Sequence, residues 1–363
     1  MSAASRTAPV AITAVAAVAA GPDDSLETLI FRGARAALDA AGLDRTDLDG
    51  VVLAASDQTD GRAITSMLTS GPAGAYLNDE INVASSPGHA LALGYMQILS
   101  GVHERLLISS WGKSSESASG SQPAERLSTD PFFERDGGLS ALAAAAMQAE
   151  RHRGADPARG ALAAALVAAR NHGDVDAAAV AASPVVASPL RALELPPEVD
   201  ATFSILLERP GRTAPAALLT GVGWCSDSGR IAERDLVGLP HLRRAAADAY
   251  ARAGATPQDV GTWHLHDCTP DAEILAYAPL GLCPPGGGID LVLSGATDRG
   301  GPLTVNPDGG SVRGEAPFGG VLAKVVDAVR QVGGAAGAER ALAHLTTGFA
   351  GQFQTVAIVE RRA

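Results

Sequence analysis

The strongest constraint on the fold of this chain is a repeated segment. Residues 26–54 predict a helix (LETLIFRGARAALDAAG), a turn (LDRTDLDG) and a strand that begins VVLA. Residues 241–267 repeat that order with HLRRAAADAYARAG, ATPQDVG and TWHLHD. A shift of 212 residues places Ala41–Gly42 on Ala253–Gly254. Such a repeat indicates a duplicated α/β unit with layered strands and helices.

The length and the remaining pattern fit two such halves. The chain has 363 residues, more than one ordinary core usually holds. Residues 8–20 alternate in the manner of a strand, so we expect the first strand there and not a signal peptide. The polar segment 114–138 should be a surface loop, with Lys113 beside it as a surface cation. Further strands are predicted at 105–110, 202–208, 216–222, 289–293 and 354–360, and helices at 87–100, 138–153, 159–173 and 319–332.

Charge and cysteine content exclude several classes of protein. The formal net charge is −12, which argues against a surface for nucleic acid or anionic lipid. The three cysteines, Cys225, Cys268 and Cys283, are too scattered for a disulfide framework or a zinc cluster, and we expect them to be inert. No segment reaches the roughly 18 apolar residues of a membrane span. We therefore expect a cytoplasmic protein with no membrane span, no metal site and no tightly bound cofactor.

Five segments together resemble one known family. VGTWHLHDCTPDAEILAYAPLGLC (260–283) resembles the segment around the His-Asp motif of thiolases of the sterol carrier protein X type. VNPDGGSVRGEAPFGG (305–320) resembles that family's Asn-Pro-x-Gly-Gly segment. The remaining three matches follow the family's order: SPLRALELPPEVDATFSILLE (188–208), ARNHGDV (169–175) and the segment 82–114, where the family carries its nucleophile helix.

This resemblance implies the thiolase fold. In that fold, two similar α/β halves pack as a five-layer αβαβα sandwich, and the protein is normally a dimer. We expect an N-terminal half over residues 1–215, with a cap insertion at about 114–200, and a C-terminal half over 216–363. The repeat described above supports the same duplication independently.

The resemblance places Ser85 where the family has its nucleophilic cysteine, three residues before a glycine. A serine needs a base in position for the attack itself. We expect that base to be His266, which matches the family's pocket histidine. His89 lies one helical turn after Ser85, but Ser85 precedes the helix proper, so we prefer His266. Ser86 followed by Pro87 is typical of a helix start, with serine at N-cap and proline at N1.

Other residues of the site follow from the same resemblance. The family's Gly-His-Pro motif falls on Glu315, Ala316 and Pro317, so its second histidine is missing and the protein is expected to be a degenerate thiolase. Glu315 could replace that histidine, but we expect a lone charge in a glycine-rich loop to face solvent. Asn306 and His264 are possible accessory residues. Four glycines are expected to contact coenzyme A or a phosphopantetheine thioester, the last two through backbone N–H groups: Gly309, Gly310, Gly348 and Gly351.

Three functions remain open from the sequence. The first, which we favour, is acyl transfer in specialised, polyketide-like or lipid-like metabolism, with Ser85 acylated from an acyl-CoA or acyl carrier protein and His266 as base. The second is an inactive subunit of a homodimer or heterodimer that supports an active thiolase or condensing enzyme. The third is carbon–carbon lysis of an acyl-CoA with a small zinc-ribbon/OB-fold companion. Such lyases rely on tyrosines near the two histidine positions, and here the nearest is Tyr277.

Overall fold

The computed structural model describes residues 7–117, 120, 126–154, 156–334 and 337–362. Its main sheet has the strand order β10-β9-β11-β12-β8-β1-β7-β4-β2-β3. The strands are β1 (Val10–Ala19), β2 (Gly50–Ala54), β3 (Asp79–Asn82), β4 (Arg105–Gly112), β7 (Ala201–Glu208), β8 (Ala217–Ser226), β9 (Thr262–Leu265), β10 (Thr304–Val305), β11 (Arg340–Thr347) and β12 (Phe353–Glu360).

The sheet consists of two five-stranded halves with the same topology. The N-terminal strands lie in the order β3-β2-β4-β7-β1, and the C-terminal strands lie in the order β10-β9-β11-β12-β8. In each half the third strand by chain order is at the outer edge and the first is at the inner edge. The halves join where β1 pairs with β8 in antiparallel register, Val10 opposite Leu219. The duplication that the sequence predicts is therefore present in the tertiary structure.

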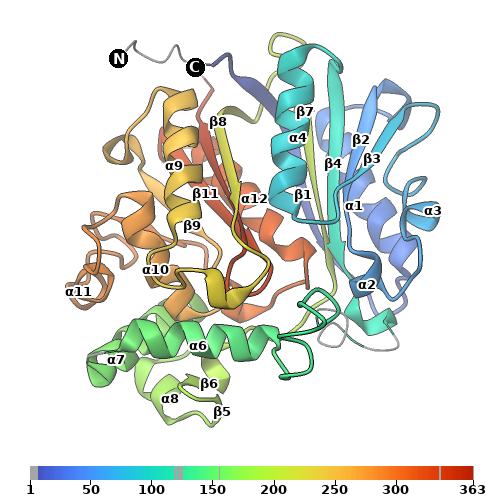
Figure 1. The fold of residues 1–363 in the computed structure, drawn as a ribbon. Coiled ribbons are helices and arrows are strands. Elements are labelled where there is room, and N and C mark those ends of the chain that lie inside the picture. The colour runs from blue at the N-terminus through green and yellow to red at the C-terminus, as the bar shows by residue number, and fades with distance from the viewer. Residues whose placement is uncertain (1–6, 118–119, 121–125, 155, 335–336, 363) are drawn as a thin grey trace.

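Helices separate and cover these two half-sheets (Figure 1). The helices of the two halves are α1 (Leu26–Ala41), α2 (Asp57–Asp60), α3 (Ser66–Thr69), α4 (Pro87–Ser100), α9 (Pro240–Ala253), α10 (Pro270–Leu280), α11 (Gly288–Leu293) and α12 (Ala323–Gly333). Helices α4 and α12 lie between the half-sheets, α1 covers the outer face of one, and α9 and α10 cover the outer face of the other. The layers are thus αβαβα, as expected for a thiolase fold.

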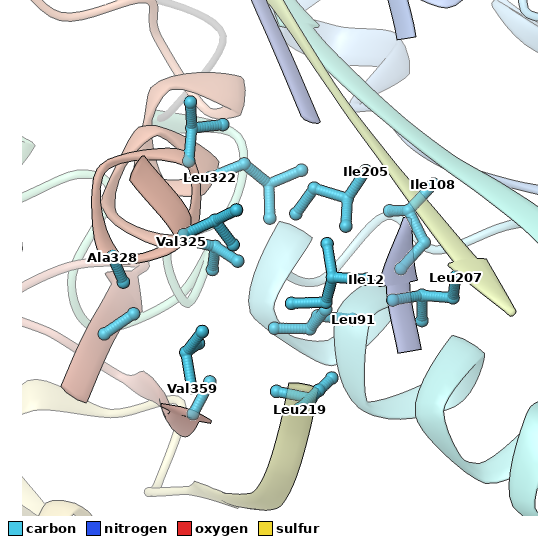
Figure 2. Packing of buried hydrophobic residues seen from close by; sticks show 14 of the residues in the cluster. Ile12, Leu91, Ile108, Ile205, Leu207, Leu219, Leu322, Val325, Ala328 and Val359 are labelled. Carbon is cyan, nitrogen blue, oxygen red and sulfur yellow. The ribbon is translucent and has the colours of Figure 1, made fainter. Parts of the chain in front are cut away.

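Alternation along the strands builds this layering. In β7, Ile205 and Leu207 belong to the central core around α4 and α12, whereas Leu206 between them packs under α1. Successive side chains of a strand point to opposite faces, so one strand serves two cores. Figure 2 shows the central core, where Leu91 of α4 and Val325 of α12 meet side chains from both half-sheets.

The repeated turn has the same local structure in both halves. Helix α1 ends at Gly42 and helix α9 ends at Gly254, both in the left-handed region with φ of 68° and 63°. A 3₁₀ turn follows each helix, and in each an aspartate side chain accepts a 2.8 Å hydrogen bond from the backbone three residues before it. These acceptors, Asp47 and Asp259, are 212 residues apart. The sequence match therefore reflects a helix stop and a capping box that both halves share.

Most predicted elements are confirmed, but the strand expected at 289–293 is wrong. That segment forms helix α11, with Val292 buried and Ile289 half-buried against the outer core of the C-terminal half. A short apolar run does not distinguish a strand from a buried helix, and here packing against other helices decides. The prediction also omitted β3, β10 and β11. β11 carries Ala, His and Thr where an aliphatic run would have marked a strand.

The cap connects β4 to β7 and packs mainly on the C-terminal half (Figure 1). It contains α6 (Ala141–Arg153), α7 (Pro157–His172), α8 (Ala177–Ala182) and the hairpin β5 (Val185–Ala187) and β6 (Leu190–Arg191). Arg153 ties it to α10 through a buried ion pair with Asp271, 2.6 Å between Nη2 and Oδ2. Lys113, expected at the surface, is buried instead, because its Nζ lies 3.1 Å from Asp200 Oδ2. Residues 118–119 and 121–125 of the expected loop lie outside the described residues.

Candidate active site

The start of α4 presents the first part of the site. As predicted, Ser86 is the N-cap and Pro87 the first helical residue, and Ser86 Oγ accepts a 3.1 Å hydrogen bond from Gly88 N. A Cβ atom at Gly88 would lie 2.5 Å from Thr355 Oγ1 and 3.4 Å from Leu345 Cβ. The glycine therefore lets the first turn of α4 rest directly on β11 and β12.

Ser85 is held at this helix start by two contacts. Its Oγ lies 3.1 Å from His89 Nδ1, and its carbonyl oxygen accepts a 3.3 Å hydrogen bond from Thr347 Oγ1 at the end of β11. Burial lowers the pKa of His89, so the imidazole is neutral at neutral pH. Ser85 itself is exposed. The hydrogen-bond partner of Ser85 is thus His89, one helical turn on, and not His266, which we had preferred.

His266 follows β9 and forms an acid–base pair with Glu315. The distance from His266 Nε2 to Glu315 Oε1 is 2.5 Å, and the two side chains are 6% and 15% exposed. The backbone of Glu315 is fixed by hydrogen bonds with Pro197 and Val199, just before β7. Our expectation that Glu315 faces solvent is wrong, because these contacts turn its carboxylate toward the histidine.

The two parts of the site lie at the same end of the sheet. β9 and β11 are parallel neighbours with Leu265 opposite His344, so His266 stands beside Leu345, on which the first turn of α4 rests. Thr347, which contacts Ser85, is two residues further along β11. Standard strand spacings put the Cα atoms of His266 and Thr347 about 8 Å apart. No hydrogen bond joins His266 to Ser85, because Nε2 contacts Glu315 and Nδ1 is buried without a partner.

A buried ionic cluster lies next to His266. Asp267 accepts hydrogen bonds from Lys324 Nζ at 3.0 Å, Asn171 Nδ2 at 2.7 Å and Ser311 N at 2.8 Å. Burial alone would raise the pKa of Asp267, but the Lys324 ammonium and the Ser311 N–H outweigh it, so the net pKa lies below the ordinary value. Asp267 is therefore a carboxylate that fixes the loop after β9 in place.

The expected accessory residues have structural contacts. The side chain of Asn306 pairs with the backbone of Leu265, accepting from N at 2.9 Å and donating to O at 3.0 Å, so it extends the pairing beyond β10. His264 is buried, and burial together with Lys324 lowers its pKa to about 3. It is neutral at neutral pH. Both residues support the segment that carries His266.

The four glycines shape the two loops of the site. The N–H groups of Gly309, Gly310 and Gly351 donate to Asn306 O, Asn171 O and Gly348 O at 3.0–3.1 Å. A Cβ atom at Gly310 would lie 1.9 Å from Asp267 Oδ2, so only glycine fits there. Gly348 and Gly351 both have positive φ, 77° and 71°. The N–H of Gly351 is thus already used within its own loop, and contact of the four glycines with coenzyme A stays a prediction.

Three further side chains do not offer catalytic groups. Burial, aided by the Glu315 and Asp267 carboxylates, raises the pKa of Cys268 to about 12, so it is a thiol at neutral pH. Tyr277 is fully buried in the outer core beside α9, where its hydroxyl donates to Glu273. Ala316 is buried in the central core. Within the described ranges, no group of three or more His, Cys, Asp or Glu side chains is arranged to hold a metal ion.

The sequence did not lead us to prefer either pairing of the site, for different reasons. The Ser85–His89 pair has the i, i+4 spacing of a helix, which was visible but not preferred. His266 and Glu315 are 49 residues apart and meet only through the packing of the long connection after β10.

None of the helices in the described part of the chain is long and apolar enough to cross a membrane.

Comparisons with known proteins identify relatives of the whole fold and of its C-terminal half. A family profile described as "Thiolase C-terminal domain-like" matches residues 223–361, which include β9, His266 and Glu315. Sterol carrier protein 2 of Homo sapiens is 39% identical over 103 residues, covering 28% of this chain. The profile and this relative support a member of the thiolase superfamily of the sterol carrier protein 2 type. This is the family that the motifs of the sequence resemble.

Two more proteins place this thiolase-like chain among its relatives. The 17-hydroxy-3-oxo-4-pregnene-20-carboxyl-CoA lyase of Mycobacterium tuberculosis is 29% identical over 177 residues, covering 45% of each protein. The solved structure "Ltp2-ChsH2(DUF35) aldolase" superposes with a TM-score of 0.81 at 20% identity, covering 97% of this chain and 98% of that one. The latter shows the shared fold. The alignments span only 19% of human sterol carrier protein 2 and 45% of the lyase.

Proposed function

We propose that this thiolase-like chain is a subunit of an enzyme that cleaves a carbon–carbon bond of a CoA thioester by acid–base chemistry of the aldol type. The observation that carries the proposal is the 2.5 Å pair between His266 and Glu315. It provides a proton acceptor in a site whose helix start presents a serine where a thiolase would need a thiol. An aldol cleavage requires proton transfer but no acyl-enzyme.

The reaction balances with the groups of this site. In a 3-hydroxyacyl thioester, the Glu315–His266 pair removes the proton of the 3-hydroxyl group. The bond between C2 and C3 breaks, a carbonyl compound leaves, and the electron pair passes to the thioester enolate. The proton held by the pair then returns to C2. The net change is one proton moved from oxygen to carbon, so no oxidant or reductant is needed.

The relatives support this class of reaction. One aligned relative is named as a CoA-thioester lyase, and the structural neighbour is named as an aldolase with two components. Lysis therefore moves ahead of acyl transfer, although the tyrosines that we expected of such lyases are absent here. In this proposal the substrate binds through the phosphopantetheine arm of its coenzyme A.

A partner chain is part of the proposal. β3 is an outer edge strand, and the residues around it expose apolar side chains. Leu77, with positive φ, is 93% exposed and Met67 is 79% exposed. Unpaired edges and exposed apolar residues of this kind are typical of an interface. We assign this surface to a second thiolase-like chain.

Acylation of Ser85 stays as the second candidate. It is favoured by the 3.1 Å contact between Ser85 Oγ and His89 Nδ1, which has the geometry of a nucleophile beside a base. Lysis ranks first because the better buried acid–base pair is His266–Glu315.

The test is turnover of 3-hydroxyacyl-CoAs by the purified chain, alone and with a co-expressed zinc-ribbon/OB-fold companion. Mass spectrometry would follow the shortened acyl-CoA and the released carbonyl compound. We expect Glu315→Gln to lower kcat at least about 100-fold, the usual contribution of a general acid or base. The matched control is Glu339→Gln, whose side chain is 83% exposed. This variant should cleave 3-hydroxyacyl-CoAs at the rate of the unmodified chain.

Two results would contradict lysis. One is a Glu315→Gln variant that is folded by circular dichroism and cleaves at the rate of the unmodified chain. The other is a complex that binds 3-hydroxyacyl-CoAs and leaves them intact. An acyl adduct on Ser85 in that second case would instead select acyl transfer.

A further inference from the structure

The hydroxyl of Ser85 is positioned from two sides and open on a third. Its oxygen lies 3.1 Å from His89 Nδ1, and Thr347 fixes the carbonyl of the same residue. The residue is exposed at the start of α4. A hydroxyl held in this way can either attack a ligand or donate a hydrogen bond to it. The two roles need opposite proton positions on His89.

The surroundings of His89 decide between these positions. A neutral imidazole has one N–H, on Nδ1 or on Nε2. His89 Nε2 is buried without a partner, and the ring lies edge-to-face against Phe353 with 5.4 Å between centroids. A buried N–H without an acceptor is rarer in proteins than an acceptor without a donor. We therefore expect the proton on Nδ1, where it would donate to Ser85 Oγ and leave the Ser85 O–H free.

Two of the backbone positions at this helix start offer no free N–H to a ligand oxygen. Pro87 has no N–H, and the N–H of Gly88 already donates to Ser86 Oγ. The first turn of α4 carries the partial positive charge of a helix N-terminus. The free Ser85 O–H is thus the side-chain donor at a point that favours negative charge. His266 Nδ1, on the neighbouring strand end, is a second buried polar atom without a partner.

We propose that the Ser85 hydroxyl donates a hydrogen bond to the thioester carbonyl oxygen of the substrate, and that His89 holds it in that direction. This inference rests on the proposed function in that it takes a CoA thioester as the ligand. Negative charge develops on that oxygen when the bond between C2 and C3 breaks, and a fixed donor stabilises it. Ser85 forms no covalent bond, and His89 is a positioning residue.

The experiment measures the thioester itself without any turnover. Butyryl-CoA labelled with ¹³C at its carbonyl is bound to the full chain, and isotope-edited infrared spectra record the carbonyl stretch. We expect a lower frequency than in solution, loss of that shift in Ser85→Ala, and its retention in Ser85→Thr. The matched control is Ser100→Ala at the other end of α4, where the hydroxyl bonds Gln97 O. Its spectrum should equal that of the unmodified chain.

A second measurement tests the role of His89. ¹⁵N NMR of labelled histidine distinguishes the two neutral tautomers, and we expect the proton on Nδ1. In turnover assays, Ser85→Ala should lower kcat about 100-fold, as loss of one oxyanion donor does. KM should change much less, because the hydrogen bond strengthens only as charge develops.

Several outcomes would overturn the inference. These are an equal carbonyl frequency in Ser85→Ala and the unmodified chain, a proton on His89 Nε2, an acyl adduct on Ser85, or no binding of butyryl-CoA. Butyryl-CoA has no 3-hydroxyl group, so its spectrum is independent of cleavage. A shift without cleavage of 3-hydroxyacyl-CoAs would leave this inference and remove the proposed lysis. Cleavage of 3-hydroxyacyl-CoAs without a shift of the carbonyl frequency would leave the proposed lysis and remove this inference.

Discussion

The two halves of the molecule share a sheet topology but differ in the connections at one end of it. In the N-terminal half, residues 83–86 join β3 to α4. In the C-terminal half, residues 306–322 join the equivalent β10 to α12. The short connection carries Ser85 and the N-cap residue Ser86. The long connection carries Asn306, Gly309, Gly310 and Glu315.

The connection between the last two strands shows the opposite difference: it is long in the N-terminal half and short in the C-terminal half. Residues 113–200, with the cap, join β4 to β7, whereas residues 348–352 join β11 to β12. Each half is thus elaborated at a different connection. Duplication preserved the sheets, whose hydrogen bonds and cores depend on one another, while loops at the strand ends were free to acquire chemistry.

The largest expected effect concerns the buried ionic cluster around Asp267, after β9 of the C-terminal half. Asp267→Asn would leave the Lys324 ammonium buried without its carboxylate, 3.0 Å away. We expect the free energy of unfolding to fall by about 3–5 kcal/mol, the usual effect of breaking a buried pair. Urea denaturation at pH 7 measures it.

A matched change tests whether burial is the cause. Asp248 pairs with Arg244 on the surface of α9, where the side chains are 33% and 70% exposed. Asp248→Asn should cost less than about 1 kcal/mol. Equal losses in the two variants would show that the cluster is no stronger than a surface pair.

The N-terminal half contains a buried carboxyl group with the opposite pKa shift. Burial raises the pKa of Asp60 to about 6, although Trp111 Nε1 donates to it at 3.0 Å. The folded state therefore binds this proton more tightly than the unfolded chain, so stability falls as the pH rises from about 4 to about 6. Asp267, with its lowered pKa, contributes stability that is lost as pH falls through its folded value.

Asp60→Asn sharpens this comparison. The amide keeps an acceptor for Trp111 and has no charge to bury. We expect the variant to be about 1–3 kcal/mol more stable than the unmodified chain at pH 7, and equal to it at pH 4. Thermal unfolding across this pH range measures both. A variant that is less stable at pH 7 would mean that the carboxylate is favourable in the folded state.

The smallest expected difference concerns the two central helices. α4 has Ser86 as a side-chain cap, whereas α12 follows a 3₁₀ turn and has no side-chain cap. Ser86→Ala should lower the free energy of unfolding by about 1 kcal/mol. The neighbouring change Ser85→Ala should leave stability within about 0.5 kcal/mol, because Ser85 is exposed. If both changes cost the same, the cap contributes nothing specific to α4.

Local patterns predicted the elements whose signal is local. The repeated helix stop at Gly42 and Gly254, the N-cap at Ser86 and the alternating first strand depend on neighbouring residues alone. The segment 289–293 was wrongly predicted as a strand, because its apolar run suits a strand or a helix equally. β11 was overlooked because its polar side chains find partners elsewhere, as His344 does with Gln354 at 2.6 Å.

The candidate site shows the same division between local and distant contacts. By itself, the sequence determined the duplicated fold, the helix that begins after Ser85, and the family motif around His266. Only the tertiary structure decided that Ser85 pairs with His89 and that His266 pairs with Glu315. Periodicity and capping act over one or two helical turns, whereas a hydrogen bond between distant residues depends on the course of every loop between them. In this chain those loops are where the two halves differ.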